Sequence, residues 1–314
     1  MKYVFFMNPV AGQGNNPKSL RDKIANSSFG EFDYKISITN AVGDGEKNAR
    51  KIAEALDGEK ARFFACGGDG TVNEIANGIV GFDNISLGII PTGTGNDTVR
   101  NFGEVSDFLD LERQFKAEPK PVDLMSYEGI IDSRWQKRYC INMFNIGFDC
   151  NVVELAARLK EKPFISGSGA YLAAVLGIFI EKRGISLTIK EDDKLIRQGE
   201  MLLCAIANGS YCGGGVYSSP QASMDDGFFD VNIINDVPRR TFLKLFPKYQ
   251  KGTHLDIPGI EKIVEVMKSK SITVEPYGKK DFFLCVDGEI FITEGVKIGM
   301  CEHAIKLLVP QPVE

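Results

Sequence analysis

The 314-residue sequence lacks an excess of positive charge, a paired-cysteine motif and any apolar run long enough to cross a bilayer. Its net charge of −5 argues against nucleic acid as the main partner, because a basic footprint is missing. None of the seven cysteines forms a CxxC pair and most lie in apolar runs, so we expect buried free thiols in a reducing compartment. The longest apolar run, 170–180, is about half of the ~20 residues that a membrane span needs. No cleavable signal is visible, so we expect a cytoplasmic protein, with peripheral membrane contact left open.

Two glycine-rich loops dominate what the sequence does contain. Gly67-Gly-Asp-Gly-Thr71 follows the apolar run 61–66, and Pro91-Thr-Gly-Thr-Gly-Asn-Asp97 follows the apolar run 85–90. Glycines at the end of a strand let backbone N–H groups approach an anion closely. A carboxylate among them cannot bind phosphate and needs a metal ion or a reacting hydroxyl as its partner. The pair of loops therefore predicts phosphoryl transfer from a nucleotide.

Each loop also allows a simpler interpretation. In the first, Asp69 would hold Mg²⁺ or lie near the transferred phosphoryl group, and Thr71 and Asn73 would begin an anion-binding helix; the alternative is a plain strand-to-helix turn. In the second, Thr94 and Gly95 would approach the nucleotide, with Asn96 and Asp97 capping the next helix, and Asp97 as a plain N-cap is the alternative. The chain has no GxxxxGK[ST] motif, so Mg²⁺ and loop amides would neutralise the phosphates of any bound ATP.

The order of apolar runs predicts two domains. Up to about residue 120, strands alternate with helices, which indicates a parallel sheet with ligands at its carboxyl edge. After Pro119-Lys-Pro121, short strands separated by turns indicate a β-sandwich or barrel. The expected strands are 3–7, 34–38, 61–66, 85–90, 122–125, 139–145, 185–189, 200–207, 228–234, 271–274, 282–286 and 304–309. The expected helices are 19–25, 46–56, 72–79, one from 97, 153–159, 170–180 and 239–251.

Two acidic turns stand out in the second half. Asp287-Gly-Glu289 follows the run 282–286 and is either a β-turn or the carrier of a general base. Residues 223–228 form either a Ca²⁺- or Mg²⁺-type loop or a solvated acidic turn. The two histidines, His254 and His303, have no metal-type partner nearby in the sequence, and we interpret both as structural.

Taken together, these motifs resemble the diacylglycerol kinase catalytic-domain family of lipid kinases. The resemblance covers residues 3 to about 309, in the order and spacing of the family. The matching segments are 8–12, 67–71 with Asn73 and Glu74, 91–97, 145–149, 208–209 with 213–215, 219–227 and 287–289.

The resemblance implies an α/β N-terminal domain of phosphofructokinase-like type with a parallel sheet, an all-β C-terminal sandwich, and an active site in the cleft between them. It also implies that the last strand rejoins the first domain. The expected division is therefore 1–122 plus 302–314 for the nucleotide-binding domain and 123–301 for the lipid-substrate domain.

Residue roles follow from the same resemblance. It implies contacts to ATP from Asn8, Gly12, Thr39, Gly67, Gly68, Asp69, Gly70, Thr71, Asn73 and Thr94. It implies an acidic network around a catalytic Mg²⁺ formed by Asp69, Asp97, Asp123 and Asp287. Glu289 would accept the proton, a role that Asp287 could share or replace. Asp226, with the carbonyls of Ser223 and Phe228, would hold a structural Mg²⁺. Thr98 departs from the apolar residue of many members and would change the lining near the nucleotide or the acceptor.

The implied activity is ATP-dependent phosphorylation of a hydroxyl on a lipid such as diacylglycerol, presented at a membrane surface. Helix 170–180, flanked by Lys160, Lys162, Lys182 and Arg183, would either contact that membrane or cover the sandwich. One alternative is a soluble-substrate kinase of the NAD kinase type, and another is a catalytically silent nucleotide- or lipid-binding regulator. The sequence leaves a homodimer open.

Overall fold

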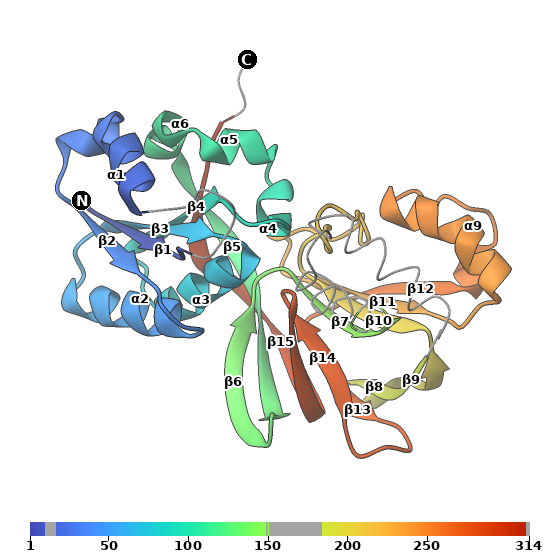
Figure 1. Cartoon of the computed structure of the whole chain (residues 1–314). Helices are drawn as coiled ribbons and strands as arrows, with labels where there is room; N and C mark the ends of the chain where they lie inside the picture. The colour runs from blue at the N-terminus through green and yellow to red at the C-terminus, as the bar shows by residue number, and fades with distance from the viewer. Residues whose placement is uncertain (10–16, 149, 151–183, 312–314) are drawn as a thin grey trace. The chain divides into compact units, whose positions relative to one another are not determined.

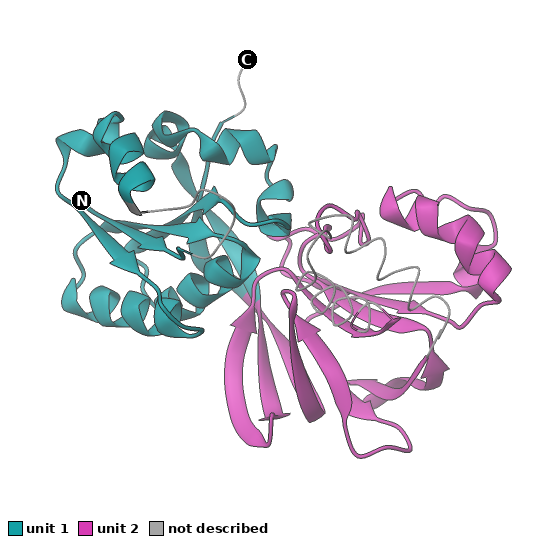
Figure 2. Ribbon diagram, viewed as in Figure 1, with its two compact units in different colours: residues 1–124, 302–314 teal, residues 125–301 magenta. Residues whose placement is uncertain are grey.

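The computed structural model describes residues 1–9, 17–148, 150 and 184–311 (Figure 1). Gly12, the expected helices 153–159 and 170–180, and the four basic residues beside the second of these lie outside the described residues. The chain divides into two compact units, 1–124 with 302–314 and 125–301 (Figure 2). The sequence prediction drew the first boundary after residue 122.

The first unit is built around a parallel sheet. Its strands are β1 (Lys2–Met7), β2 (Tyr34–Ile38), β3 (Ala61–Gly67) and β4 (Ile85–Pro91), in the order β4-β3-β1-β2. Strands β1, β3 and β4 are apolar and buried along nearly their whole length, as expected for strands covered on both faces. The last strand, β15 (Glu289–Val309), pairs in parallel with β4 at Leu307 and Leu87.

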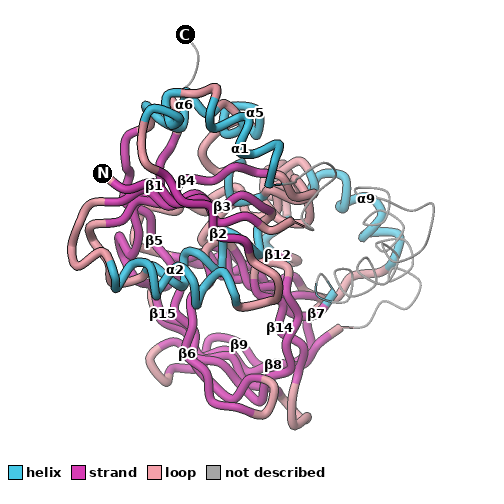
Figure 3. The backbone as a smooth tube through the Cα atoms, turned by 60° about the vertical axis from the view of Figure 1, so that its left-hand side comes forward, coloured by secondary structure: helices cyan, strands magenta, loops and turns pink. Residues whose placement is uncertain are grey.

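Helices cover both faces of this sheet (Figures 1 and 3). On one face lie α1 (Pro17–Ala25), α5 (Val105–Leu109) and α6 (Leu111–Lys116), and on the other lie α2 (Asp44–Ala55) and α3 (Asp69–Ile79). The short elements are η1 (Ser28–Glu31) and α4 (Asp97–Arg100). Phe5, Phe29 and Phe64 form the centre of one core, with ring centroids 4.8 Å apart for Phe5 and Phe64 and 5.1 Å for Phe29 and Phe64. Burying each such ring contributes about 1.5–3 kcal/mol.

The second unit is an antiparallel sandwich. One sheet has the order β12-β11-β10-β7-β14-β15, while β13 pairs with both β15 and β8, β8 pairs with β9, and β5 pairs with β15 and β6. The strands are β5 (Glu118–Ile131), β6 (Arg134–Cys140), β7 (Met143–Gly147), β8 (Ile185–Glu191), β9 (Lys194–Met201), β10 (Leu203–Ala207), β11 (Phe229–Ile234), β12 (Val264–Ser269), β13 (Ser271–Pro276) and β14 (Phe282–Val286). Helix α9 (Arg239–Gln250) and the turn η2 (Ile260–Lys262) complete it. The predicted fold class is confirmed.

Several element bounds differ from the sequence prediction. The single strand expected over 139–145 is two strands, β6 and β7, because the amides of Ile141 and Asn142 turn away from the ladder to a carboxylate. Strand β5 runs through Pro119 and Pro121, where the prediction placed a break, and β12 was not predicted because charged residues interrupt its apolar pattern. All seven cysteines are free, and all but Cys301 are buried, as expected. Among the described helices, none combines the length and apolarity of a membrane span.

Candidate active site

The carboxyl ends of the parallel strands bring the N-terminal motifs to one edge of the first unit. The amide of Asn8, after β1, donates to the carbonyl of Cys66 on β3 at 3.2 Å, and the amide of Thr92, after β4, donates to that of Gly67 at 2.9 Å. Thr39, after β2, is buried and donates its amide to the carbonyl of Met7 at 2.9 Å. Residues that are far apart in the sequence therefore surround the ends of four neighbouring strands.

The two glycine loops pack against each other backbone to backbone. A Cβ added to Gly93 would lie 2.4 Å from Cα of Gly68, and one added to Gly67 would lie 2.2 Å from Oγ1 of Thr71. Contacts this short do not occur, so a side chain at Gly93 would force the two loops apart, and one at Gly67 would displace Thr71 within the first loop. The absence of Cβ atoms leaves the peptide groups of both loops accessible to a bound ligand.

Helix α3 starts inside the first loop. Its first internal hydrogen bond runs from the amide of Val72 to the carbonyl of Gly68 at 3.1 Å. The amides of Asp69, Gly70 and Thr71 therefore have no acceptor within the helix, which makes this end suited to a phosphate. Asn73 accepts a hydrogen bond from Nδ2 of Asn77 at 3.1 Å, and Thr94 is exposed on the second loop.

Asp69 is held from one side only. Its Oδ1 accepts hydrogen bonds from the amide of Thr98 at 3.1 Å and from the hydroxyl of Thr98 at 3.2 Å. Its Oδ2 accepts none from the described residues and lies 2.7 Å from where a Cβ of Gly95 would be. Thr98 is 1% exposed, so it does not line a ligand surface as expected but orients Asp69.

Two further acids of the predicted network have local partners. Asp97 is buried at the start of α4, and its Oδ1 lies 3.8 Å from Nε of Arg100. The capping residue of α4 is Asn96, whose side chain makes no capping bond. Asp123 is fully buried, and its Oδ1 accepts the amide of His303, a residue with φ of 52°, at 2.7 Å. Within the described part of the chain, no group of three or more His, Cys, Asp or Glu side chains could hold a metal ion.

Glu74 has a positioning role that the motif alone did not reveal. Its Oε1 accepts the amide of Gly43 at 2.7 Å and its Oε2 accepts the amide of Gly45 at 2.8 Å. A carboxylate at this end of α2 is favoured by the helix dipole. Glu74 thus fixes the segment that follows Thr39. The sequence shows Glu74 within a motif, but not the helix end that it meets.

Asp287 occupies a two-residue hairpin turn between β14 and β15. Asp287 and Gly288 have φ of 48° and 91°, the left-handed values that such turns require and that Asp-Gly favours. The Oδ1 of Asp287 accepts the amides of Asn142 at 2.9 Å and Met143 at 3.0 Å, and Oδ2 accepts the amide of Ile141 at 2.9 Å. The thiol of Cys140 also donates to Oδ1 at 3.2 Å.

These contacts enclose the carboxylate although the residue as a whole is partly exposed. Burial raises the pKa of Asp287 above its usual value. The four hydrogen bonds lower the pKa, but their effect is smaller than that of burial. Burial together with the charge of Asp287 raises the pKa of the Cys140 thiol. Glu289 lies at the start of β15, opposite Val286, and is exposed. Of the two acids in this turn, Asp287 is engaged with backbone and Glu289 faces solvent.

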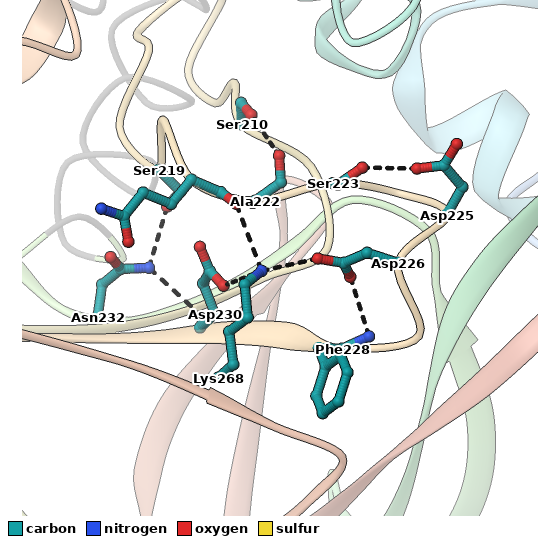
Figure 4. A network of polar contacts seen from close by, with 11 residues as sticks. Ser210, Ser219, Ala222, Ser223, Asp225, Asp226, Phe228, Asp230, Asn232 and Lys268 are labelled. Atoms are coloured by element: carbon teal, nitrogen blue, oxygen red, sulfur yellow. Dashed lines mark hydrogen bonds and ion pairs between the residues drawn. The ribbon is translucent and has the colours of Figure 1, made fainter.

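The residues predicted to hold a structural Mg²⁺ lie in the loop before β11 (Figure 4). Asp226 accepts the amide of Phe228 at 3.0 Å and the ammonium of Lys268 at 2.7 Å. The hydroxyl of Ser223 donates to the neighbouring Asp225 at 2.6 Å. Lys268 was not among the residues that the sequence pointed to, because it lies some forty residues away on β12.

Comparisons with known proteins match both units. Residues 2–127 match the diacylglycerol kinase catalytic domain family, and residues 142–309 match the YegS C-terminal NAD kinase beta sandwich-like domain family. A diacylglycerol kinase of Staphylococcus saprophyticus is 29% identical over 90% of this chain and 87% of its own length. A diacylglycerol kinase of Mycobacterium tuberculosis is 26% identical over 99% of this chain and 96% of its own length. The crystal structure of a diacylglycerol kinase from Bacillus anthracis shares the fold, with a TM-score of 0.68 and 23% identity over 99% of this chain and 97% of that one.

Proposed function

Since this chain belongs to the kinase family that joins a diacylglycerol kinase catalytic domain to a YegS C-terminal β-sandwich domain, we propose that it is an ATP-dependent lipid kinase. It transfers the γ-phosphoryl group of ATP to a hydroxyl of diacylglycerol or a related amphiphile at a membrane surface. The observation that carries the proposal is the contact of the two glycine loops at Gly68 and Gly93, with the free Oδ2 of Asp69 beside them.

Nucleotide binding is assigned to the carboxyl edge of the first unit. The free amides of Asp69, Gly70 and Thr71 at the start of α3 receive phosphate oxygens. The further contacts to ATP come from Asn8, Gly12, Thr39, Gly67, Gly68, Asn73 and Thr94.

A cation fits this edge because Oδ2 of Asp69 accepts no hydrogen bond from the described residues. The Oδ2 atoms of Asp69 and Asp97 also lie 2.7 and 3.5 Å from the point that a Cβ of Gly95 would occupy. Asp69 and Asp97 would hold Mg²⁺. Asp123 and Asp287 each fix backbone of their own unit, Asp123 at His303 and Asp287 at residues 141–143. When bound, Mg²⁺ supplies positive charge that offsets the charge developing on the phosphates.

Glu289 is assigned to the acceptor hydroxyl. The hydroxyl oxygen forms a bond to the γ-phosphorus while the bond from that phosphorus to the β–γ bridging oxygen breaks, and ADP leaves. The hydroxyl proton passes to the carboxylate of Glu289. Asp287, whose carboxylate is engaged by three amides and a thiol, holds the turn that presents Glu289 and is a positioning residue.

The test is phosphorylation of mixed micelles with radiolabelled ATP. The acceptor panel is diacylglycerol, phosphatidylglycerol, sphingosine, ceramide and undecaprenol, with NAD⁺ as a soluble acceptor. Label in one lipid is the expected result. Label in NAD⁺ alone would contradict the lipid assignment and favour a soluble-substrate kinase, which the NAD kinase-like description of the second unit makes the second candidate. No label in any acceptor, with ATP binding retained in calorimetry, would favour a silent regulator.

The base is tested by Glu289→Gln, which keeps the shape of the side chain and removes its charge. We expect lipid phosphorylation to be abolished and the thermal unfolding midpoint to stay unchanged. Asp281→Asn, an exposed acid before β14, is the matched control and should keep full activity. Near-normal turnover by Glu289→Gln would remove Glu289 from the mechanism.

Delivery of the acceptor at a membrane is tested separately by vesicle flotation. We expect the protein to float with vesicles that contain anionic lipid. Absence from the floating fraction, with and without anionic lipid, would contradict the membrane assignment without affecting the transfer reaction.

A further inference from the structure

The loop that precedes β11, together with the start of β11, carries a set of oxygen atoms of the kind that holds a divalent cation. These oxygens are Oδ2 of Asp226 and Oδ1 of Asp230 (Figure 4) and the backbone carbonyl of Gln221. Two carboxylates and a carbonyl are hard oxygen ligands, which Mg²⁺ and Ca²⁺ prefer. In this protein all three converge on the ammonium of Lys268.

The distances match the donors of an ammonium group. Nζ of Lys268 lies 2.7 Å from Asp226 Oδ2, 3.0 Å from Asp230 Oδ1 and 3.4 Å from the carbonyl of Gln221. Lysine has three N–H donors and no acceptor; Nζ of Lys268 donates hydrogen bonds to Asp226 and Gln221 and forms an ion pair with Asp230. The arrangement is fixed by the fold, because Lys268 on β12 is the direct cross-strand neighbour of Asp230 on β11.

The charges explain why a cation is needed at this point. The side chain of Asp230 is 1% exposed, and burial raises the pKa of Asp230, an effect that Lys268 partly offsets. A buried carboxylate without a positive partner is strongly destabilising. Burial lowers the pKa of Lys268, but its bonds to Asp226 and Asp230 outweigh this effect and raise it overall. Lys268 therefore stays charged at neutral pH.

A divalent ion does not fit the implied site while Lys268 is present. Of the two oxygens of Asp226, Oδ1 accepts the amide of Phe228 and Oδ2 accepts Lys268. A metal on Asp226 would have the ammonium as its neighbour, and like charges at such short range repel. The side chains around Asp226 are therefore incompatible with the structural Mg²⁺ that the family resemblance implied.

We propose that Lys268 takes the place of a divalent metal ion between the loop 221–228 and the start of β11. The second unit therefore reaches its full stability without metal. Removing the ammonium leaves two carboxylates and a carbonyl that can bind Mg²⁺ or Ca²⁺, so the variant acquires a dependence that the natural chain lacks. This inference does not rest on the proposed kinase activity.

The experiment measures thermal unfolding of the full chain without nucleotide, in EDTA and in millimolar Mg²⁺ or Ca²⁺. For the natural protein we expect the same midpoint in all three conditions. Lys268→Met, which keeps the apolar stem, should lower the midpoint in EDTA by about 5 °C or more, and either metal should restore at least half of the loss. Lys297→Met, an exposed lysine on β15, is the control and should respond to neither change.

Two further variants keep the proposal testable if Lys268→Met does not fold. Lys268→Arg keeps the charge and should stay independent of metal. The double variant Lys268→Met/Asp230→Asn removes both charges and should be more stable in EDTA than the single variant.

Three outcomes would overturn the proposal. The first is a rise in the natural protein's midpoint with metal that Asp226→Asn abolishes, because a metal would then displace the lysine. The second is an unchanged midpoint for Lys268→Met in EDTA. The third is destabilisation that neither metal rescues, because Lys268 would then be an ordinary ion-pair partner.

Discussion

Asp69 of the first unit and Asp287 of the second unit have similar surroundings in the sequence but different partners in the structure. Both follow a buried strand and precede a glycine. Asp69 is held by one residue, Thr98, and keeps an oxygen that accepts no hydrogen bond from the described residues. Asp287 accepts three consecutive amides and a thiol. We infer from the difference that hydrogen-bond partners separate an acid that serves architecture from one that is left available for chemistry, which is the role proposed for Asp69.

The strongest test of this comparison is the removal of charge from Asp69. Asp69→Asn keeps an oxygen for Thr98 but loses the charge at the glycine loops, so we expect kcat to fall by about 10³-fold or more. The unfolding midpoint should stay within the error of the natural protein. Initial rates at saturating ATP and lipid measure the first quantity, and differential scanning calorimetry measures the second. If the loss of kcat were accompanied by a clear fall in the unfolding midpoint, Asp69 would hold the structure together as Asp287 does.

For Asp287→Ala we expect the main effect on stability instead of on kcat. It leaves the buried amides of Ile141, Asn142 and Met143 without their acceptor, and each such loss costs about 1–3 kcal/mol. We expect the free energy of unfolding to fall by about 3–5 kcal/mol, measured in urea by circular dichroism and by the fluorescence of Trp135, the single tryptophan.

Asp132→Ala is the matched control for Asp287→Ala. Asp132 also lies in a hairpin turn with φ of 48°, but from the described residues it accepts one amide, that of Ile292, in an exposed setting. We expect its loss to cost about 1 kcal/mol. Similar destabilisation by both variants would show that the three amides of 141–143 are satisfied without Asp287.

A smaller effect on rate is expected when the support of Asp69 is weakened. Thr98→Val removes the hydroxyl that donates to Oδ1 and keeps the amide that also donates to it. Because a hydrogen bond to a charged group contributes about 1.5–3 kcal/mol, kcat should fall by about 10-fold. The KM for ATP should change little, and Thr98→Ser should restore the rate. Thr188→Val, a buried threonine of the second unit, should leave kcat unchanged. An unchanged kcat for Thr98→Val would show that the amide alone orients Asp69.

The sequence predicted what depends on local pattern. The parallel strands and the two glycine loops follow from apolar runs that end in Gly67-Gly68 and Pro91-Thr-Gly93. That these loops touch at Gly68 and Gly93 follows from β3 and β4 being neighbours in register. The period of the apolar residues indicates the strands, but it does not show the contact between their loops.

What the sequence could not show are pairings between distant segments. Lys268 meets Asp226 and Asp230 only because β12 lies beside β11, and β12 itself carries charges that hide its strand pattern. The bond from Thr98 to Asp69 joins the first turns of α4 and α3, and that from the amide of Gly43 to Glu74 joins the start of α2 to α3. In each case the residue types were visible, and the tertiary register that gives them a role was not.

The last prediction separates the two acids by their side-chain donors. Cys140 donates its thiol to Asp287 as Thr98 donates its hydroxyl to Asp69, so the two variants form a pair. Since a thiol is a weak donor and three amides remain on Asp287, Cys140→Ala should lower the free energy of unfolding by no more than about 2 kcal/mol. Cys204→Ala, an equally buried thiol without a carboxylate, should lower it by a similar amount. Neither variant should change kcat in the micelle assay. A fall in kcat for Cys140→Ala but not for Cys204→Ala would show that Asp287 acts in the reaction itself, and the contrast with Asp69 would then be lost.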